Sequence, residues 1–199
     1  MNVILTLILI LLLAIVAVGV LVAIIYNQLV TFKNRFKNAF SQIDVQLRRR
    51  YDLIPNIVNT AKAYLQHESG TLEAVTEARA KATSAQISLG GDPTQLSALS
   101  QLMAADGQLS AAMGRLLVSM EAYPELKADS TVASVMEELS STENRIAFAR
   151  QAYNDAVMHY NEAREKFPAV LFSEMFGFGL AEFWLIDESE AAAPPKVEF

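Results

Sequence analysis

The 199-residue chain contains no cysteine and only two histidines, His67 and His159. Without a thiol it can form no disulfide, no thiolate metal site and no cysteine nucleophile. The histidines do not make up for this, because His67-Glu68 begins like a zincin helix but Thr71 stands where the second histidine would be needed. The sequence predicts no metal site and no cofactor.

The sequence also lacks the patterns of the common catalytic sites. No glycine-rich loop follows a strand pattern, and no serine stands in the strand–turn–helix setting of a nucleophile elbow. Gly90-Gly91 is typical of a connection between helices, and the neighbouring carboxylates Glu137 and Glu138 point apart on a helix surface. Acidic residues outnumber basic ones, with a net charge of −6, which argues against nucleic-acid binding. We therefore predict no catalytic residues and no enzymatic activity.

What the chain does contain is a long apolar run from Val3 to Ile25, in which Thr6 is the only polar residue. About 20 apolar residues in a helix cross the hydrocarbon core of a bilayer. A cleaved signal peptide has a basic start and an apolar part of only about 7–15 residues, and the chain shows neither feature. We predict a permanent transmembrane helix at 3–25, after a short extracytoplasmic N-terminus at 1–2.

Basic residues follow the apolar run and none precedes it. Lys33, Arg35 and Lys37 lie close behind it, so the positive-inside tendency places the main domain in the cytoplasm. The alternative is an exported domain behind an uncleaved anchor. Tyr26 stands at the level expected of an interfacial aromatic residue, and the three basic residues are candidates for contact with anionic lipid headgroups.

Past the anchor, apolar residues recur with the period of a helix and not with that of a strand. One seam repeats every seven residues at Leu29, Phe36, Ile43, Arg50, Ile57 and Tyr64, and a second repeats at Lys33, Phe40, Leu47, Ile54 and Ala61. We expect one helix to run from the anchor to about Ser88, where Gly90 and Gly91 end it. Pro55 lies inside this helix and leaves the Tyr51 carbonyl without its helical donor.

Two further long helices are predicted. Asp92 and Pro93 begin one of them as N-cap and first residue, and it runs to about Ala122. Ser130 caps the other, which runs to about Phe167 and repeats every seven residues at Val132, Leu139, Ile146, Tyr153, Tyr160 and Phe167. Three long helices with short connections predict an all-α, antiparallel, coiled-coil-like bundle at 26–186 that is continuous with the anchor.

The C-terminal part divides into two sections. Residues 169–186 hold many large apolar groups, and they form either a short C-terminal helix that closes the bundle or an interfacial segment that dips into the membrane. Residues 187–199 combine alanines, two prolines and acids, which is typical of a flexible acidic tail. Together, residues 169–199 carry six acidic side chains against Lys196 alone, a net charge of −5.

Polar residues on the helix seams predict a network between helices. Tyr153-Asn154 and Tyr160-Asn161 either fix the register by hydrogen bonds to a neighbouring helix or line a groove for a peptide or partner helix. Arg50 needs a buried partner, for which Asp155, Glu162 or a neighbouring subunit is available. The candidate network consists of Asp44, Arg49, Arg50, Tyr153, Asn154, Tyr160 and Asn161.

Residues 26–68 resemble the LemA family of bacterial membrane proteins. The matching motifs are Tyr26-Asn27, Ser41 to Leu47, Arg49-Arg50, Asp52 to Asn56 and His67-Glu68, then Tyr153-Asn154-Asp155, Tyr160-Asn161, Phe167-Pro168, Gly177-Phe178 and the ending Pro195 to Phe199. The resemblance therefore covers nearly the whole chain. Arg48 and Tyr51 stand where the family pattern leads us to expect other residues.

The resemblance implies one anchor in the inner membrane of a bacterial cell, a helical cytoplasmic domain and no agreed enzymatic activity. Members of the family are associated with the formation of magnetosome membranes, and their genes often neighbour those of membrane metalloproteases or of TPM-domain proteins. We therefore predict a scaffold or adaptor that works through protein contacts and forms a homo-oligomer. The alternatives are a membrane-remodelling protein that uses residues 169–186 and an accessory partner of a membrane protease in quality control.

Overall fold

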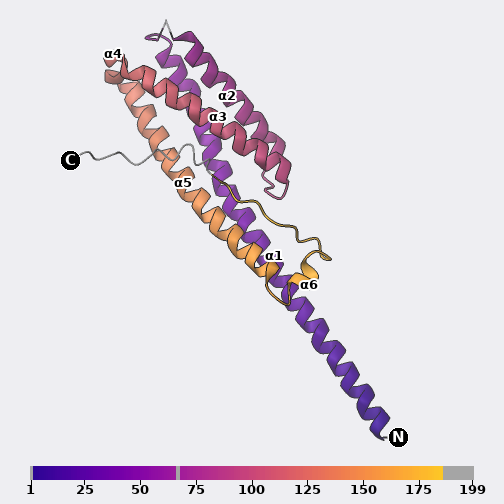
Figure 1. Ribbon diagram of the computed structural model, residues 1–199. Helices are drawn as coiled ribbons and strands as arrows, with labels where there is room; N and C mark the ends of the chain where they lie inside the picture. The colour runs from indigo at the N-terminus through magenta and orange to yellow at the C-terminus, as the bar shows by residue number, and fades with distance from the viewer. Residues whose placement is uncertain (1, 66–67, 186–199) are drawn as a thin grey trace, which may run out of the picture.

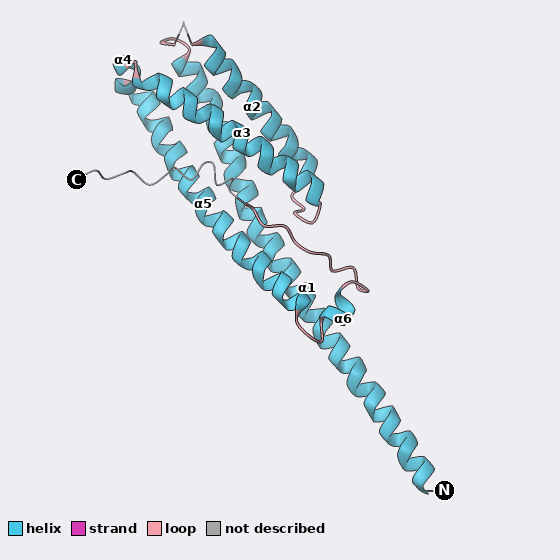
Figure 2. Cartoon of the chain, in the orientation of Figure 1, coloured by secondary structure: helices cyan, strands magenta, loops and turns pink. Residues whose placement is uncertain are grey.

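The computed structural model describes residues 2–65 and 68–185, and within these ranges it contains six helices and no strand (Figures 1 and 2). The helices are α1 (Asn2–Ala61), α2 (Ser69–Leu89), α3 (Leu96–Glu121), α4 (Pro124–Ala128), α5 (Ser130–Glu165) and α6 (Val170–Ser173). The all-α class predicted from the sequence is confirmed. Residue 1 of the predicted extracytoplasmic N-terminus, His67 and the predicted tail at 187–199 lie outside the described residues.

The longest helix, α1, joins the apolar run to the bundle without a break. It has 60 residues, which corresponds to a length of about 90 Å at 1.5 Å per residue. Its first part projects from the other helices (Figure 1). Almost every side chain from Val3 to Ile24 is exposed. From Ile25 onward one face of α1 is buried against the bundle. The helix contains a stretch long and apolar enough to cross a membrane, and its continuity with the bundle is confirmed.

The predicted seam of α1 forms the centre of the core. Leu29, Phe36, Ile43, Arg50 and Ile57 are all buried, as are Phe40, Leu47, Ile54 and Ala61 of the second seam. α5 packs along α1 in the opposite direction and buries its own repeat from Val132 to Tyr160. Phe167 is the exception, since it is 80% exposed and lies beyond the end of α5 at Glu165.

The helix expected to reach Ser88 is in fact two helices, so the bundle has four long helices instead of three. α1 ends at Ala61, and its carbonyl accepts bonds from the Tyr64 and Leu65 N–H groups at 3.0 and 2.8 Å, which close the chain into a tight turn. α2 then runs back along α1 and pairs with α3 (Figure 1). The reversal lets α2 bury its own apolar face, which includes Leu72 and Val75, against its neighbours.

The predicted helix starts need correction at two aspartates. Asp92 does not cap a helix at Pro93, because its Oδ1 atom accepts a bond from the Thr94 N–H at 3.1 Å within a turn, and α3 begins only at Leu96. Asp129, and not Ser130, caps α5 by accepting bonds from the Val132 and Thr131 N–H groups. These donors stabilise the charged carboxylate and lower the pKa of Asp129 below its usual value.

Pro55 is accommodated within α1 by a contact from the neighbouring helix. A proline at this position removes the N–H that would have bonded to the Tyr51 carbonyl. In the structure that carbonyl accepts a hydrogen bond from Nε of Arg79, on α2, at 2.5 Å. The position that lost its helical donor thus becomes a link between α1 and α2.

Candidate functional site

The most distinctive site is a groove along α5 that holds part of the chain itself. After α6 the chain turns at Gly177, whose φ of 73° suits a residue without a Cβ atom. Residues 177–185, which we call the C-terminal segment, then run back alongside α1 and α5 without forming a helix or strand (Figure 2). This segment is the second half of the apolar section that the sequence left as either a closing helix or a membrane segment.

Two asparagines of α5 bind the main chain of the C-terminal segment in the same way. Asn154 accepts a bond from the Trp184 N–H at 2.8 Å and donates one to the Trp184 carbonyl at 3.1 Å. Asn161 accepts from the Ala181 N–H and donates to the Ala181 carbonyl, both at 3.0 Å. Each side-chain amide therefore pairs with one residue of the segment through both of its polar atoms.

Three further side chains of α5 donate to carbonyls of the segment. The Tyr153 hydroxyl donates to Glu182 at 2.8 Å and the Tyr160 hydroxyl to Gly179 at 2.7 Å. Nε of Arg164 donates to the carbonyl of Phe178 at 2.7 Å. We call the five side chains that bind the segment the clamp: Tyr153, Asn154, Tyr160, Asn161 and Arg164.

Every third residue of the C-terminal segment is buried. Phe178, Ala181 and Trp184 face the bundle, whereas Leu180 and Leu185 are exposed. A period of three is typical of an extended backbone, which leaves most of its polar groups to other partners. The segment has one internal backbone bond, from the Leu185 N–H to the Phe183 carbonyl at 3.1 Å. The clamp supplies the other partners.

Aromatic rings form the floor beneath the clamp. Phe36 of α1 lies 4.9 Å from the Tyr160 ring between centroids, and Phe40 lies 5.8 Å from Tyr153 and 6.3 Å from Trp184. Burial under these rings and the segment raises the pKa of both tyrosines above its ordinary value. The hydroxyls are thus held in the protonated form that can donate to the segment.

A buried cluster of charges lies further along the same helices. Arg50 of α1 and Asp106 of α3 are each only 1% exposed and form an ion pair, and Asp106 also pairs with Arg150 of α5. Glu143 reaches Nη1 of Arg50 at 3.0 Å, and the Tyr51 hydroxyl donates to Asp106 at 3.1 Å. Burial raises the pKa of Tyr51 to about 12, although the adjacent Arg50 opposes this shift. The cluster joins three helices at one point.

The charge cluster and the clamp are in contact through one cation–π pair. The guanidinium carbon of Arg150 lies 5.0 Å from the centroid of the Trp184 ring, within the range of a favourable interaction. The guanidinium of Arg150 therefore forms an ion pair with Asp106 and also lies over the Trp184 ring, near the end of the C-terminal segment. Arg150 thus contacts both sites.

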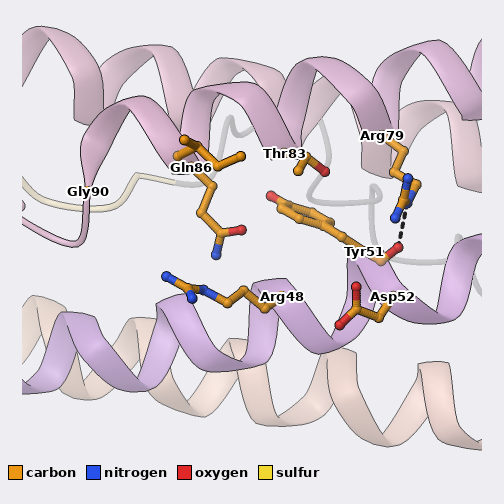
Figure 3. Close-up of a pocket in the computed structure, with 8 residues that line it drawn as sticks. Arg48, Tyr51, Asp52, Arg79, Thr83, Gln86 and Gly90 are labelled. Carbon is orange, nitrogen blue, oxygen red and sulfur yellow. Dashed lines mark hydrogen bonds between the residues drawn. The ribbon is translucent and has the colours of Figure 1, made fainter.

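A separate cleft of about 390 Å³ opens between α1 and α2. Figure 3 shows Arg48 and Asp52 on α1 opposite Gln86, Thr83 and Arg79 on α2. Its polar groups mainly connect the two helices, since Arg79 holds the Tyr51 carbonyl and Gln86 donates to Asp44. Within residues 2–65 and 68–185, no group of three His, Asp or Glu side chains is placed to hold a metal ion.

The structure separates the predicted polar network into several contacts. Arg49 pairs with Glu138 of α5 at 2.7 Å, and Asp44 accepts from Gln86 of α2 at 2.8 Å. The partners of Arg50 are Asp106 and Glu143, so the expectation of Asp155 or Glu162 is wrong. The two Tyr-Asn pairs bond to the C-terminal segment of the same chain. Whether they also bind a peptide or partner helix of another protein stays a prediction.

The residues predicted at the membrane interface lie where α1 enters the bundle. Tyr26 packs edge-on against Phe176 and Phe178, with ring centroids 5.4 and 5.5 Å apart. Lys33 lies over the Phe178 ring at 5.7 Å, and Arg35 lies over the ring of its neighbour Phe32 at 5.3 Å. Lys37 pairs with Asp92 in the α2–α3 connection at 3.0 Å. None of these contacts tests the prediction of headgroup binding.

Sequence reasoning missed several residues of the two sites. Asp106 stands in the apolar stripe of α3 between Leu102 and Leu109, and a charged residue at a core position was the available signal. Arg150 and Arg164 gave no such signal, because they flank the α5 seam and acquire their roles only through Asp106 and the C-terminal segment.

Residues 39–199 match the profile of the LemA family. The chain belongs to this family. Three of the motifs that suggested LemA membership meet in the structure, since the two Tyr-Asn pairs belong to the clamp and Gly177-Phe178 begins the segment that the clamp holds. Arg50, in another of the motifs, lies in the buried charge cluster.

Relatives of this LemA-family chain are named either as magnetosome proteins or as protein LemA. The magnetosome protein MamQ 2 of Paramagnetospirillum magneticum is 29% identical over 178 residues, which cover 80% of this chain and 64% of the relative. The magnetosome protein MamQ of Magnetospirillum gryphiswaldense is 26% identical with the same coverage. Protein LemA of Metamycoplasma hominis is 25% identical over 68% of this chain and 57% of its own length. The chain thus spans less than two thirds of each of these relatives.

Proposed function

We propose that this LemA-family chain is a membrane-anchored scaffold that acts through protein contacts at the cytoplasmic face of a bacterial membrane and self-associates. Its apolar helix and its family are those of a membrane-associated protein. We propose no enzymatic activity for the chain. Its partners are further copies of the chain, anionic lipid headgroups and, by the association of LemA genes, a membrane metalloprotease or a TPM-domain protein.

The observation that carries the proposal is the continuity of α1. The same helix is exposed and apolar from Val3 to Ile24 and forms the core of the bundle from Ile25 to Ala61. A bundle built on its own membrane helix has a fixed height and orientation above the bilayer, as a scaffold requires. Four apolar side chains on its outer faces are exposed and are the positions where we place contacts with other proteins: Val45, Ile87, Val118 and Phe148.

The test is purification of the tagged full-length protein in mild detergent, with mass spectrometry of bound proteins and native mass measurement. We expect a mass of at least two copies and at least one stoichiometric membrane partner. A control variant with Val118 and Phe148 changed to serine should lose part of these contacts while keeping its helical content. Recovery of the wild type as a bare monomer would contradict the proposal.

The cytoplasmic orientation can be tested because the chain has no cysteine of its own. A single cysteine at the exposed position Ala152 of α5 should react with a membrane-impermeant maleimide only after the cells are opened. A cysteine at Asn2 should react in intact cells, because the positive-inside tendency places that end outside. Labelling of the Ala152 variant in intact cells would show that the domain is exported.

A second candidate function, membrane remodelling, is favoured by the surface beside the exit of α1. Phe167, Leu171 and Met175 are 80%, 64% and 70% exposed, and their neighbour Phe176 packs against Tyr26 at the end of the apolar run. An exposed apolar surface at that level can insert between headgroups. The names of the magnetosome relatives also suggest a role in organising a membrane.

Liposome flotation of a variant that lacks residues 2–24 tests this second function. Ile25 and the buried part of α1 remain, so the bundle keeps its core. If the surface inserts, the variant should float with anionic vesicles, and changing Phe167, Leu171 and Met175 to serine should abolish flotation. If the variant stays at the bottom of the gradient, the apolar surface does not insert into the membrane. The scaffold proposal is unaffected by that result.

A further inference from the structure

The clamp recognises a main chain, and its contacts do not depend on the side chains of the peptide it holds. All seven hydrogen bonds from the five clamp residues go to backbone N–H or C=O groups of residues 178–184. Any chain that adopts the same extended conformation presents the same donors and acceptors. The clamp is therefore a binding site for an extended peptide, and the C-terminal segment is the peptide that occupies it here.

The side chains that enter the groove define which peptides fit. Phe178 and Trp184 fill the two end positions, and the small Ala181 lies between them, close to Asn161. Of the intervening residues, Leu180 and Phe183 are 54% and 37% exposed. The groove therefore suits peptides with an aromatic, a small and an aromatic residue at every third position, a pattern that we write aromatic-x-x-small-x-x-aromatic.

Basic residues surround the groove at both ends. Arg164 and Lys33 flank the position of Phe178, and Arg150 covers that of Trp184. Between them, the Glu182 side chain of the resident segment reaches the Ser100 hydroxyl of α3 at 3.2 Å. Arg164 also reaches the carboxylate of Glu174, just before the segment, at 3.6 Å, so an acidic peptide is favoured over a basic one.

The resident segment can leave without breaking any secondary structure. Residues 178–185 belong to no helix or strand, and most of the hydrogen bonds that hold the segment come from the clamp, with one more from Ser100 of α3 to Glu182. Gly177 provides a turn at its start that a residue with a Cβ atom would rarely adopt. Leu180 and Leu185 already face solvent, so only one side of the segment is bound.

We propose that the clamp binds an acidic, extended segment of a partner protein with the pattern aromatic-x-x-small-x-x-aromatic, and that the C-terminal segment is its built-in competitor. A partner segment and the resident segment then exclude one another, so that binding of the partner releases residues 177–185. This inference deepens the scaffold proposal, on which it rests, by giving the chemistry of the partner.

The test uses full-length protein in lipid nanodiscs and a fluorescein-labelled peptide with the sequence of residues 174–187, followed by fluorescence anisotropy. The wild type should bind weakly because its own segment competes. Trp184→Ala weakens the resident segment and vacates a pocket, and we expect it to bind the peptide at least tenfold more tightly. Phe178→Ala, at the other end of the groove, should increase peptide affinity by the same factor. This variant replaces Trp184→Ala in the assay if Trp184→Ala has lost helical content.

Two controls separate clamp binding from non-specific adhesion of an apolar peptide. Adding Asn154→Ala and Asn161→Ala to the Trp184→Ala variant should weaken binding at least tenfold, whereas adding Asp155→Ala, an exposed neighbour, should not. A peptide N-methylated at the nitrogens equivalent to Ala181 and Trp184 cannot donate to the two asparagines and should not bind. Equal binding by the methylated peptide, or no gain in either pocket variant, would overturn the inference. If the peptide assay fails in this way but the full-length protein still copurifies with partners, the scaffold proposal holds without the inference about the clamp.

Discussion

Asp106→Ala is expected to lower the free energy of unfolding by about 3–5 kcal/mol, the usual cost of removing one partner from a buried ion pair. Arg50 is 1% exposed and would keep only Glu143 as an ionic partner, while Arg150 would lose the carboxylate that it shares with Arg50. The Tyr51 hydroxyl would lose its acceptor as well. Because whole domains are stable by only about 5–15 kcal/mol, this single change should bring the bundle close to unfolding.

Urea denaturation of the full-length protein in detergent, followed by circular dichroism, measures the effect. Asp155→Ala is the matched control, since Asp155 is an exposed aspartate in another helix and its loss should change stability by less than about 0.5 kcal/mol. Similar midpoints for Asp106→Ala and Asp155→Ala would mean that the buried cluster does not stabilise the fold.

A triple variant distinguishes the cost of an orphaned charge from a general loss of packing. Changing Arg50 to Met, Asp106 to Leu and Arg150 to Met removes all three charges and retains much of their volume. Replacement of a buried ionic triad by apolar residues is often neutral or stabilising, so most of the stability lost in Asp106→Ala should return. Glu143 is half exposed and can remain solvated after Arg50 is removed.

The sequence predicted the long-range architecture because the helix seams are regular. Heptad spacing on α1 and α5 identified the faces that pack together, and nearly every residue of those seams is buried. It did not predict the break after Ala61, since the seam continues in register to Tyr64 and no proline or glycine stands between Ala61 and Ser69. Ser69-Gly70 was the remaining signal, because a glycine inside a helix costs about 1 kcal/mol relative to alanine.

The candidate site was predictable only in part, for a physical reason. Tyr153-Asn154 and Tyr160-Asn161 stand seven residues apart, so their place on one helical stripe could be read from the sequence. Their partners could not, because the C-terminal segment offers main-chain atoms, which every sequence has. The partner of Arg50 was likewise hidden, since Asp106 comes from α3, whose position beside α1 depends on the unexpected reversal at α2.

The second large effect concerns the end of the C-terminal segment, where two neighbouring aromatic residues are buried to different extents. Trp184 is 3% exposed and touches Phe40 and Arg150, whereas Phe183 is 37% exposed. Replacing a buried tryptophan by alanine typically costs about 3–5 kcal/mol. Since the segment can open without unfolding the helices, the loss should appear mainly as local release of residues 177–185.

Hydrogen exchange of the full-length protein reports this release at the Ala181 N–H, which is bonded to Asn161 in the closed segment. A loss of about 3 kcal/mol corresponds to exchange about a hundredfold faster in Trp184→Ala, while amides in the middle of α5 should exchange as in the wild type. Phe183→Ala should accelerate exchange at Ala181 less than Trp184→Ala does, because Phe183 is 37% exposed whereas Trp184 is 3% exposed. Equal acceleration in both variants would indicate that segment order depends on apolar content and not on the Trp184 pocket. Acceleration throughout α5 would show instead that the segment is an inseparable part of the bundle core, which would leave the clamp unable to exchange one peptide for another.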